Sequence, residues 1–456
     1  MHDRQRRKFL SLGAKTLCGA GLALGSSPWH TLANIAHADT GFNDYRALVC
    51  VYLEGGMDGF SLLVPDGDAE YAEYVASRGD LSVARSGAIP LQMRSAETAK
   101  VRLHPSCAPL ADLYDDGRLA FINNVGTLIE PTTKEQYENN AVRLPSQLFS
   151  HADQEIQWQQ LQGQSNGTEG WGALAAQELA GQQERDYLTS VSLAGANYWQ
   201  ASSQRRPFSV RSSGLVNYAG MSDGSEWQRP RVESFQRVAE QPYSHVFMQA
   251  YADLQRRAGD ITSELGAVLA DQPRLSTQVP LDNDLAAQLS MVAQMIAAHP
   301  VLGMKRQIFY VRMDGFDVHD NQNKNQPGLF TQLTDALMYF QATIDELGLS
   351  ESITTFTASD FGRSLTSNGD GTDHGWGNHH MVLGSAVNGG DIYGQLPRMS
   401  TEGPDAIRNG RVIPTLSASQ YAASLLRWAG LQESSLDLVL PDLGNFSARD
   451  LGFLRS

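Results

Sequence analysis

Cysteine is scarce in this chain, which has 456 residues and only Cys18, Cys50 and Cys107. It contains no C-x-x-C pair and no C-x-x-C-H motif, and no G-x-G-x-x-G follows a strand-like run. The sequence therefore offers no support for an iron–sulfur, haem or dinucleotide cofactor. One Cys50–Cys107 disulfide is possible in an oxidising compartment, but two cysteines do not make a disulfide scaffold.

Positive charge is also in short supply. The chain carries 35 Lys and Arg against 50 Asp and Glu, which gives a formal net charge of −15. Phosphate backbones and anionic lipid surfaces attract proteins through basic side chains. The charge balance therefore argues against nucleic acid or an anionic membrane as a partner.

Long apolar runs are absent after residue 24. The run 9–24 is shorter than the ~20 residues that span a bilayer, and Lys15 interrupts it, so we expect no stable membrane anchor. Four basic residues precede this run, and Ala36-His37-Ala38 has the small residues typical of a signal-peptide cleavage site. This pattern predicts an export signal over residues 1–38 and a periplasmic or secreted mature protein. Its removal leaves 30 basic and 49 acidic residues.

The paired arginines define the expected export route. Arg6 and Arg7 stand in the segment RRKFL, which fits a twin-arginine signal, and the twin-arginine machinery exports folded proteins. An ordinary secretory signal with a chance arginine pair is the alternative.

The rest of the chain alternates strand-like and helix-like runs, which is the pattern of a mostly parallel sheet flanked by helices. We expect strands at 47–53, 119–125, 307–312 and 353–358, and helices at 106–115, 150–161, 332–347 and 418–429. The pattern predicts one α/β domain over residues 39–456, because loops from both ends of the chain would have to meet at one site.

Residues of about 202–300 form an expected insertion. The stretch 202–227 is rich in Ser, Gly, Arg and aromatic residues, and 232–298 has apolar residues at helical spacing. A helical block inserted between strands either caps a site or packs on the far face of the sheet. The sequence leaves both arrangements open.

Three strand-like runs end in loops that carry Asp or His. They are 47–58 (ALVCVYLEGGMD), 307–319 (QIFYVRMDGFDVH) and 353–360 (ITTFTASD), and the His-rich stretch 372–380 (TDHGWGNHH) follows the last. In open α/β sheets, ligands bind where parallel strands end. Acid and imidazole groups at three such ends predict one assembled site for a hard or borderline metal ion.

Five segments behind the signal carry a family resemblance: LEGGMDGFSLLVP, LHPSCAPLADLY, MDGFDVHDNQ, SDFGRS and GTDHGWGN, in this order. Together they resemble the bacterial family called domain of unknown function 1501 (DUF1501), over nearly the whole mature chain. That family is grouped with the alkaline phosphatase and sulfatase superfamily. The resemblance implies an alkaline-phosphatase-like α/β fold, with a mostly parallel central sheet flanked by helices, and a metal-assisted phospho- or sulfo-transfer site.

The resemblance also implies metal ligands, taken position by position. Asp58 stands in the place of the superfamily's first metal-binding aspartate, and Asp317 and His319 resemble the Asp/His pair that holds the other metal. Asp360 stands where the superfamily has an Asp-His pair. Phe361 occupies the histidine position of that pair, so one expected imidazole is missing.

The late histidine of the superfamily has more than one candidate. His374, with Asp373 beside it, would supply this ligand, and His379 or His380 is the competing assignment. Two divalent ions about 4 Å apart would serve ester hydrolysis. The missing imidazole makes a one-metal site credible, and the ion would be zinc, calcium or magnesium.

Two further residues are candidates for the chemistry. Ser150 at a helix start resembles the hydroxyl nucleophile, because helix N-terminal amides favour an attacking oxygen and a transferring anion. Arg363 would clamp a phosphate or sulfate through two nitrogens.

Each candidate also has a purely structural interpretation. Asp58 would shape a turn, Asp360 would cap one, Ser150 would be an N-cap, and Arg363 would pair with a carboxylate. The segment NGDGTD at 368–373 would form a small calcium loop, although the EF-hand spacing is absent. For His104 and His151 we favour buried, satisfied histidines over residues that support a metal ligand.

The sequence thus predicts an exported, metal-dependent hydrolase-like protein whose substrate is a small anionic phosphate or sulfate ester. The rival hypothesis is a metal-bearing or metal-free binding or assembly protein that kept the fold and lost turnover, and the missing imidazole and the uncertain nucleophile favour it. A third possibility, a twin-arginine substrate with a redox cofactor, has no motif to support it.

Overall fold

The structure, a computed structural model, describes residues 42–95, 101–163, 167–181, 183, 185–215 and 226–455. The expected signal segment 1–38 lies outside these residues and stays a prediction. Among the described residues, no helix is long and apolar enough to cross a membrane.

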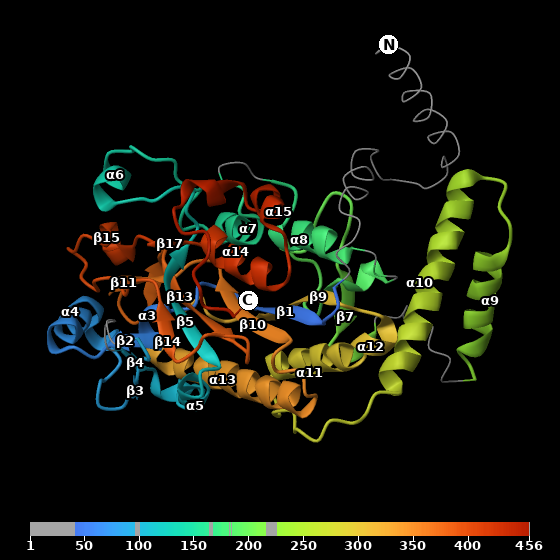
Figure 1. The fold of residues 1–456 in the computed structure, drawn as a ribbon, viewed down its shortest axis with the longest axis horizontal. Helices are drawn as coiled ribbons and strands as arrows, with labels where there is room; N and C mark the ends of the chain where they lie inside the picture. Colours follow the sequence, from blue (N-terminus) through green and yellow to red (C-terminus); the bar gives the residue numbers. More distant parts are fainter. Residues whose placement is uncertain are drawn as a thin grey trace, which may run out of the picture.

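A ten-stranded sheet forms the centre of the protein (Figure 1). Its middle strand β1 (Arg46–Leu53) pairs in parallel with β10 (Ile353–Ser359) on one side and with β9 (Arg306–Met313) on the other. The outer strands are β6 (Ser190–Ser192), β7 (Phe208–Arg211) and β8 (Gly214–Leu215) beyond β9, and β13 (Asn378–Leu383), β5 (Leu119–Gly126), β14 (Asp391–Tyr393) and β17 (Leu416–Ser417) beyond β10. Only β13 and the edge strand β8 run antiparallel to their neighbours.

Helices cover both faces of this sheet (Figure 1). One side carries α5 (Leu110–Asp115), α11 (Asp284–Ala297) and α13 (Gln322–Glu346), and the other carries α7 (His151–Gln160), α8 (Trp171–Ala180), α14 (Ala418–Trp428) and α15 (Glu433–Val439). Among the described residues, the remaining α-helices are α3 (Gly59–Leu62), α4 (Asp68–Arg78), α6 (Lys134–Glu138), α9 (Arg229–Glu240), α10 (Val246–Ala270) and α12 (His299–Leu302). The predicted α/β class, a mostly parallel sheet between helical layers, is confirmed.

Strand β1 shows why the sheet needs both layers. Val49 and Val51 belong to one hydrophobic core cluster, and Cys50 and Tyr52 belong to the cluster on the opposite face. Successive side chains of a strand point to opposite faces, so a strand buried on both faces is a continuous apolar run. Cys107 lies in the first cluster, and both thiols are buried and free. The two cysteines therefore do not form the disulfide that the sequence left possible.

Several expected elements are found with altered ends. The helix predicted at 332–347 is the longer α13, which begins ten residues earlier at Gln322. Its first turns read QNKNQPG, and polar residues followed by Pro327 and Gly328 do not look helical in sequence. The helix predicted at 106–115 is a 3-10 turn, Pro105–Cys107, followed by the short α5.

Three small sheets surround the main one. They are β2–β4–β3 (Leu63–Pro65, Val101–Leu103 and Ile89–Leu91), the hairpin β11–β12 (Arg363–Ser367 and Thr372–His374) and the pair β15–β16 (Ala406–Ile407 and Arg411–Val412). The hairpin β11–β12 lies between β10 and β13 in the chain and carries predicted site residues. In the expected insertion, α9 and α10 pack on each other at one end of the molecule, and α11 packs against β9 and α13 (Figure 1).

Candidate metal centre

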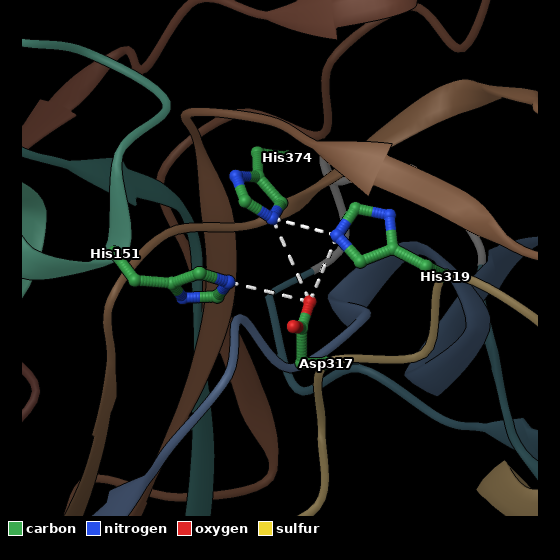
Figure 2. Close-up of side chains that lie close together, drawn as sticks. All are labelled: His151, Asp317, His319 and His374. Atoms are coloured by element: carbon green, nitrogen blue, oxygen red, sulfur yellow. Dashed lines mark hydrogen bonds and ion pairs between the residues drawn. The ribbon is translucent and has the colours of Figure 1, made fainter.

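Four side chains converge at the carboxyl edge of the central strands: His151, Asp317, His319 and His374 (Figure 2). One ligand atom from each lies within 4.8 Å of the other three. Asp317 Oδ1 is 3.3, 3.1 and 3.6 Å from Nε2 of His151, His319 and His374, and the last two Nε2 atoms are 2.8 Å apart. No other such group of three or more His, Cys, Asp or Glu occurs among the described residues.

The fold brings these residues together from three parts of the chain. Asp317 and His319 lie in the loop that follows β9, and Gly315 in this loop has a φ of 103°, a conformation that favours glycine. His374 ends the hairpin strand β12 just before β13 begins, and β13 starts at this edge because it is antiparallel to β10. His151 is the first residue of α7.

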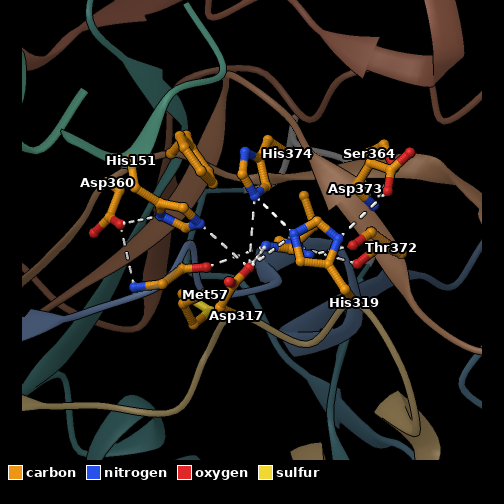
Figure 3. A network of polar contacts seen from close by, with 12 residues as sticks. Met57, His151, Asp317, His319, Asp360, Ser364, Thr372, Asp373 and His374 are labelled. Carbon is orange, nitrogen blue, oxygen red and sulfur yellow. Dashed lines mark hydrogen bonds and ion pairs between the residues drawn. The ribbon is translucent and has the colours of Figure 1, made fainter. Parts of the chain in front are cut away.

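An oxygen atom lies near the far nitrogen of each imidazole. Nδ1 of His151 is 2.7 Å from Asp360 Oδ2 (Figure 3), and Nδ1 of His374 is 2.7 Å from the Phe149 carbonyl oxygen. Nδ1 of His319 is 3.4 Å from Asp373 Oδ1. Oxygens of this kind fix the tautomer of a metal-binding histidine, because the proton stays on Nδ1 and the Nε2 lone pair is left for the ion.

A neutral ring held in this way directs its Nε2 lone pair at the same point as Asp317. His151 Nε2 is buried and makes no hydrogen bond there. Several lone pairs beside a carboxylate repel one another unless a cation lies between them. A tetrahedral ion with bonds of about 2.0–2.1 Å would place its ligand atoms about 3.3 Å apart. Four of the six separations, 2.8 to 3.6 Å, lie around that value, and all six are within 4.8 Å, so the donor set fits a divalent ion.

The surroundings shift the pKa values of these groups in different directions. The hydrogen bond to Asp360 raises the pKa of His151, although partial burial opposes it. Burial lowers the pKa of His374, while its bond to Phe149 acts in the opposite direction. Burial would raise the pKa of Asp317, but Arg363 and His151 hold it below its usual value. An ionised carboxylate beside a neutral His374 is the state that metal binding requires.

Arg363 lies beneath this cluster and is fully buried. Its Nη1 donates to Asp317 Oδ1 at 2.9 Å and to the Gly55 carbonyl at 3.1 Å, and its Nε donates to Thr372 Oγ1 at 3.2 Å. Its Nη2 donates to the Thr372 carbonyl. The structure thus places the predicted phosphate clamp inside the protein, with donors on all three nitrogens directed at protein oxygens.

Asp58 and Asp360 lie near the cluster but outside it. Asp58 is buried in a salt bridge with Arg78, a residue of α4. Asp360 accepts from the Tyr52 hydroxyl at 2.8 Å and from the Gly55 amide at 3.3 Å, in addition to its contact with His151. Both are predicted ligands, and their carboxylates contact protein groups.

The remaining candidates are spread around the centre. Ser150 is the N-cap residue of α7, and its Oγ donates to Asp153 Oδ2 at 2.7 Å. Asp373 accepts from the Asn368 amide at 3.0 Å as well as contacting His319. Phe361 stacks on His374 with ring centroids 4.6 Å apart, so the expected histidine position holds an aromatic wall.

The competing histidines lie deeper. His379 and His380 are fully buried on β13, and burial lowers the pKa of each to about 3. His379 Nδ1 accepts from the backbone N–H of Asn124 at 3.1 Å. His104 is also buried, and its Nδ1 accepts from the Ser106 amide at 3.1 Å.

His151 is the group member that the sequence did not single out as a ligand. Alone in SHADQEIQWQQL it looks like a helix residue that packs inward. Its sequence gives one signal, the adjacent helix start at Ser150, because a helix N-terminus near a strand edge is a frequent place for site residues. Its distance in sequence from Asp317 and His374 hides the contact.

The sequence profile of the family described as "Protein of unknown function (DUF1501)" matches residues 45–425. The chain belongs to this family. The match includes all four residues of the cluster and every strand of the central sheet. The resemblance drawn from the five short segments is thereby confirmed. No curated protein matches the sequence.

Solved structures that resemble this chain include a sulfatase and an alkaline phosphatase. The structure of Ps i-CgsB with k-i-k-neocarrahexaose is 10% identical, covering 87% of this chain and 74% of that chain, with a TM-score of 0.38. PsFucS1 sulfatase from Pseudoalteromonas sp. is 10% identical, and the match covers 94% of this chain and 78% of that chain with a TM-score of 0.32. Wild-type alkaline phosphatase PafA is 11% identical, and the match covers 71% of this chain and 64% of that chain with a TM-score of 0.28. Likeness at this level says nothing about the activity of this DUF1501 member.

Proposed function

We propose that this DUF1501 protein is an exported, metal-dependent hydrolase-like protein that acts on phosphate or sulfate esters. The observation that carries the proposal is the convergence of three Nε2 atoms and Asp317 Oδ1, with an oxygen behind each imidazole. Among zinc, calcium and magnesium, we propose zinc, because calcium and magnesium take oxygen ligands whereas three nitrogens and one oxygen suit zinc.

His151, Asp317, His319 and His374 would hold the ion. A bound zinc ion would polarise the ester and neutralise charge on the leaving oxygen. Asp317 also accepts from Arg363, so its carboxylate stays ionised and oriented at the protein side of the centre. Phe361 covers the centre beside His374 and His151 and excludes water from that side.

Ser150 remains our proposed nucleophile. It directly precedes the ligand His151, and its hydroxyl donates to the Asp153 carboxylate, which can accept the proton when the oxygen attacks. The amides at the start of α7 lack a side-chain cap from Ser150. Unpaired helix N-terminal amides favour the negative charge of a phosphate or sulfate group.

A binding or assembly protein without turnover is the second candidate. One observation favours it: four protein side chains surround the ion position, as in closed structural zinc sites, whereas catalytic sites keep a position open. Hydrolysis at this centre requires a fifth coordination position or movement of one ligand.

Elemental analysis of the purified protein, together with a screen of aryl phosphate and aryl sulfate esters, tests the proposal. We expect bound zinc in the wild type, its loss in His374→Ala, and its retention in the control His245→Ala, whose histidine is exposed on the α9–α10 hairpin. Ester turnover that falls at least 100-fold in both His374→Ala and Ser150→Ala supports a hydrolase. Bound zinc without any turnover supports a metal-bearing binding protein, and a metal-free wild type refutes the metal centre.

Export by the twin-arginine machinery is a separate part of the proposal. It rests on Arg6, Arg7 and the apolar run that follows them. Replacing both arginines by lysine should retain the protein in the cytoplasm at its uncleaved length, as seen by cell fractionation. Unchanged export of this variant would indicate the ordinary secretory route.

A further inference from the structure

One oxygen of the buried Asp58 carboxylate, Oδ2, is held by protein groups, and the other, Oδ1, is buried without a hydrogen-bond partner. Oδ2 accepts from Ser61 Oγ at 2.7 Å and from Gln322 Nε2 at 2.6 Å, and it forms the salt bridge with Arg78. Both side chains of this ion pair are 0% exposed. Arg78 also donates to the Ser364 carbonyl at 3.0 Å. A cation therefore already lies against Asp58, and it is a guanidinium.

The other position at which a second ion would bind is Asp360. The two oxygens of Asp360 face Tyr52, Gly55 and His151. The ring of Phe361 lies so close to Gly56 that a Cβ added at this glycine would come within 2.5 Å of the ring. Asp58 and Asp360 do not share a group of ligand atoms with any third acid or histidine among the described residues.

A chain of buried hydrogen bonds joins Asp58 to the metal centre. Gln322 Nε2 donates to Asp58, and Gln322 Oε1 accepts from Thr372 Oγ1 at 2.8 Å. Thr372 Oγ1 accepts from Arg363 Nε at 3.2 Å, and Arg363 Nη1 donates to Asp317 Oδ1 at 2.9 Å. The chain thus ends on the carboxylate oxygen that faces the three imidazoles.

The charge of Asp58 sets the direction of every link. An ionised carboxylate only accepts, so the amide nitrogen of Gln322 must face Asp58 and its oxygen must face Thr372. The single hydroxyl proton of Thr372 is then used on Gln322, which leaves its lone pairs for Arg363. Thr372 is fully buried, so water cannot replace a broken link without cost.

We propose that the centre holds one ion, and that Asp58 is a positioning residue which, paired with Arg78, orients Arg363 against Asp317 through Gln322 and Thr372. The inference rests on the proposed metal-dependent function. It assigns Asp58 a role other than the ligand role expected from its place in the sequence. Hydrogen-bonded partners of a metal ligand typically change metal affinity 10- to 100-fold when removed.

Metal stoichiometry is the first test. The purified protein is loaded with excess zinc, freed of unbound metal and analysed for zinc per chain. We expect one zinc per chain in the wild type. Two zinc ions per chain, with one lost in Asp58→Asn, would overturn the inference and leave the proposed function standing, whereas a wild type that binds no zinc would overturn both.

Thr372 allows a test that keeps the Asp58–Arg78 pair intact. Thr372→Val removes the hydroxyl and should weaken zinc binding 10- to 100-fold in competition with a chelator, while Thr372→Ser should restore it. The matched control is Thr355→Val, because Thr355 is an equally buried threonine of β10 whose hydroxyl has no partner. The control should bind zinc like the wild type.

The serine variant separates positioning from packing. Val keeps the size of Thr without the hydroxyl, and Ser keeps the hydroxyl without the methyl group, so a packing role would leave zinc binding in Thr372→Val like that of the wild type and would weaken it in Thr372→Ser instead. Zinc affinity in Thr372→Val equal to that of the wild type would overturn the positioning role, even if zinc binding and ester turnover are found as proposed.

Discussion

Asp360 Oδ2 lies 2.7 Å from Nδ1 of His151, although 209 residues separate them in the chain. The carboxylate is itself held by the Tyr52 hydroxyl and the Gly55 amide. The pair turns the opposite nitrogen of His151 toward Asp317, 3.3 Å away. A residue at the end of β10 thus orients a ligand that stands on α7.

This relationship predicts the effect of Asp360→Asn. The amide cannot accept from Nδ1 with the strength of a carboxylate, so zinc affinity should fall 10- to 100-fold, as measured by chelator competition. Asp335→Asn, at an exposed position of α13, serves as the control and should bind zinc like the wild type. An unchanged affinity in Asp360→Asn would show that His151 is not oriented by this contact.

Removal of the ion should lower thermal stability. A ligand that binds only the folded state at 100 times its dissociation constant stabilises it by about 2.7 kcal/mol. A chelator should therefore lower the melting temperature of the wild type and leave His319→Ala unchanged, because that variant lacks one of the four ligands. Equal sensitivity of the two proteins to the chelator would place the bound metal elsewhere.

Removing one partner of the buried Asp58–Arg78 pair should destabilise the protein strongly, whereas replacing both partners by apolar residues should not. Arg78→Met leaves an uncompensated buried carboxylate and should lower the free energy of unfolding by about 3–5 kcal/mol. The double variant Asp58→Leu/Arg78→Met should recover most of that loss in denaturant titrations. Additive losses in the double variant would contradict this account.

The same pair gives a prediction for acid. Burial would raise the pKa of Asp58, but Arg78 and Ser61 bring it below its ordinary value of 3.8. A lowered folded pKa contributes stability that is present above the unfolded pKa and is lost as the pH falls through the folded value. The wild type should therefore lose stability below about pH 4 more steeply than the double variant, in urea titrations across pH.

Glu54 should make stability depend on pH in the opposite direction, with a loss as the pH rises. Burial and a hydrogen bond with Asp314 raise the pKa of Glu54 from 4.5 to about 7, despite Arg312 nearby. A raised folded pKa contributes stability below the unfolded value that is lost as the pH rises through about 7. Glu54→Gln should therefore gain melting temperature relative to the wild type between pH 5 and pH 8. A difference that does not change with pH would contradict the raised pKa.

Much of the frame could be predicted from the residues. The runs that became β1, β9 and β10 are apolar and end in glycine and acid, so their burial and shared edge follow from pattern alone. The strand-end loops predict a metal site, the family resemblance implies Asp317, His319 and His374 as its ligands, and the fold brings these three together. The family followed from five short segments and is confirmed over residues 45–425.

The rest depended on contacts between distant parts of the chain. The sequence favours a satisfied core histidine at position 151, and no motif in α4 marks Arg78 as a partner of Asp58. His151 meets Asp317 only because α7 packs against β10, and Arg78 meets Asp58 only because α4 packs beside β11. Neither contact leaves a periodic signal in sequence.

The sequence by itself determined the α/β class, the edge of the sheet and the chemical types of the ligands, because periodicity and strand-end residues are local properties. The tertiary structure decided which of these groups face one another. It joined His151 to the cluster and placed Arg78 against Asp58, where the sequence had suggested a metal ligand. The physical reason is that an aspartate looks the same in sequence whether a metal ion or a guanidinium neutralises its charge. Only the packing of the chain decides which cation lies beside it.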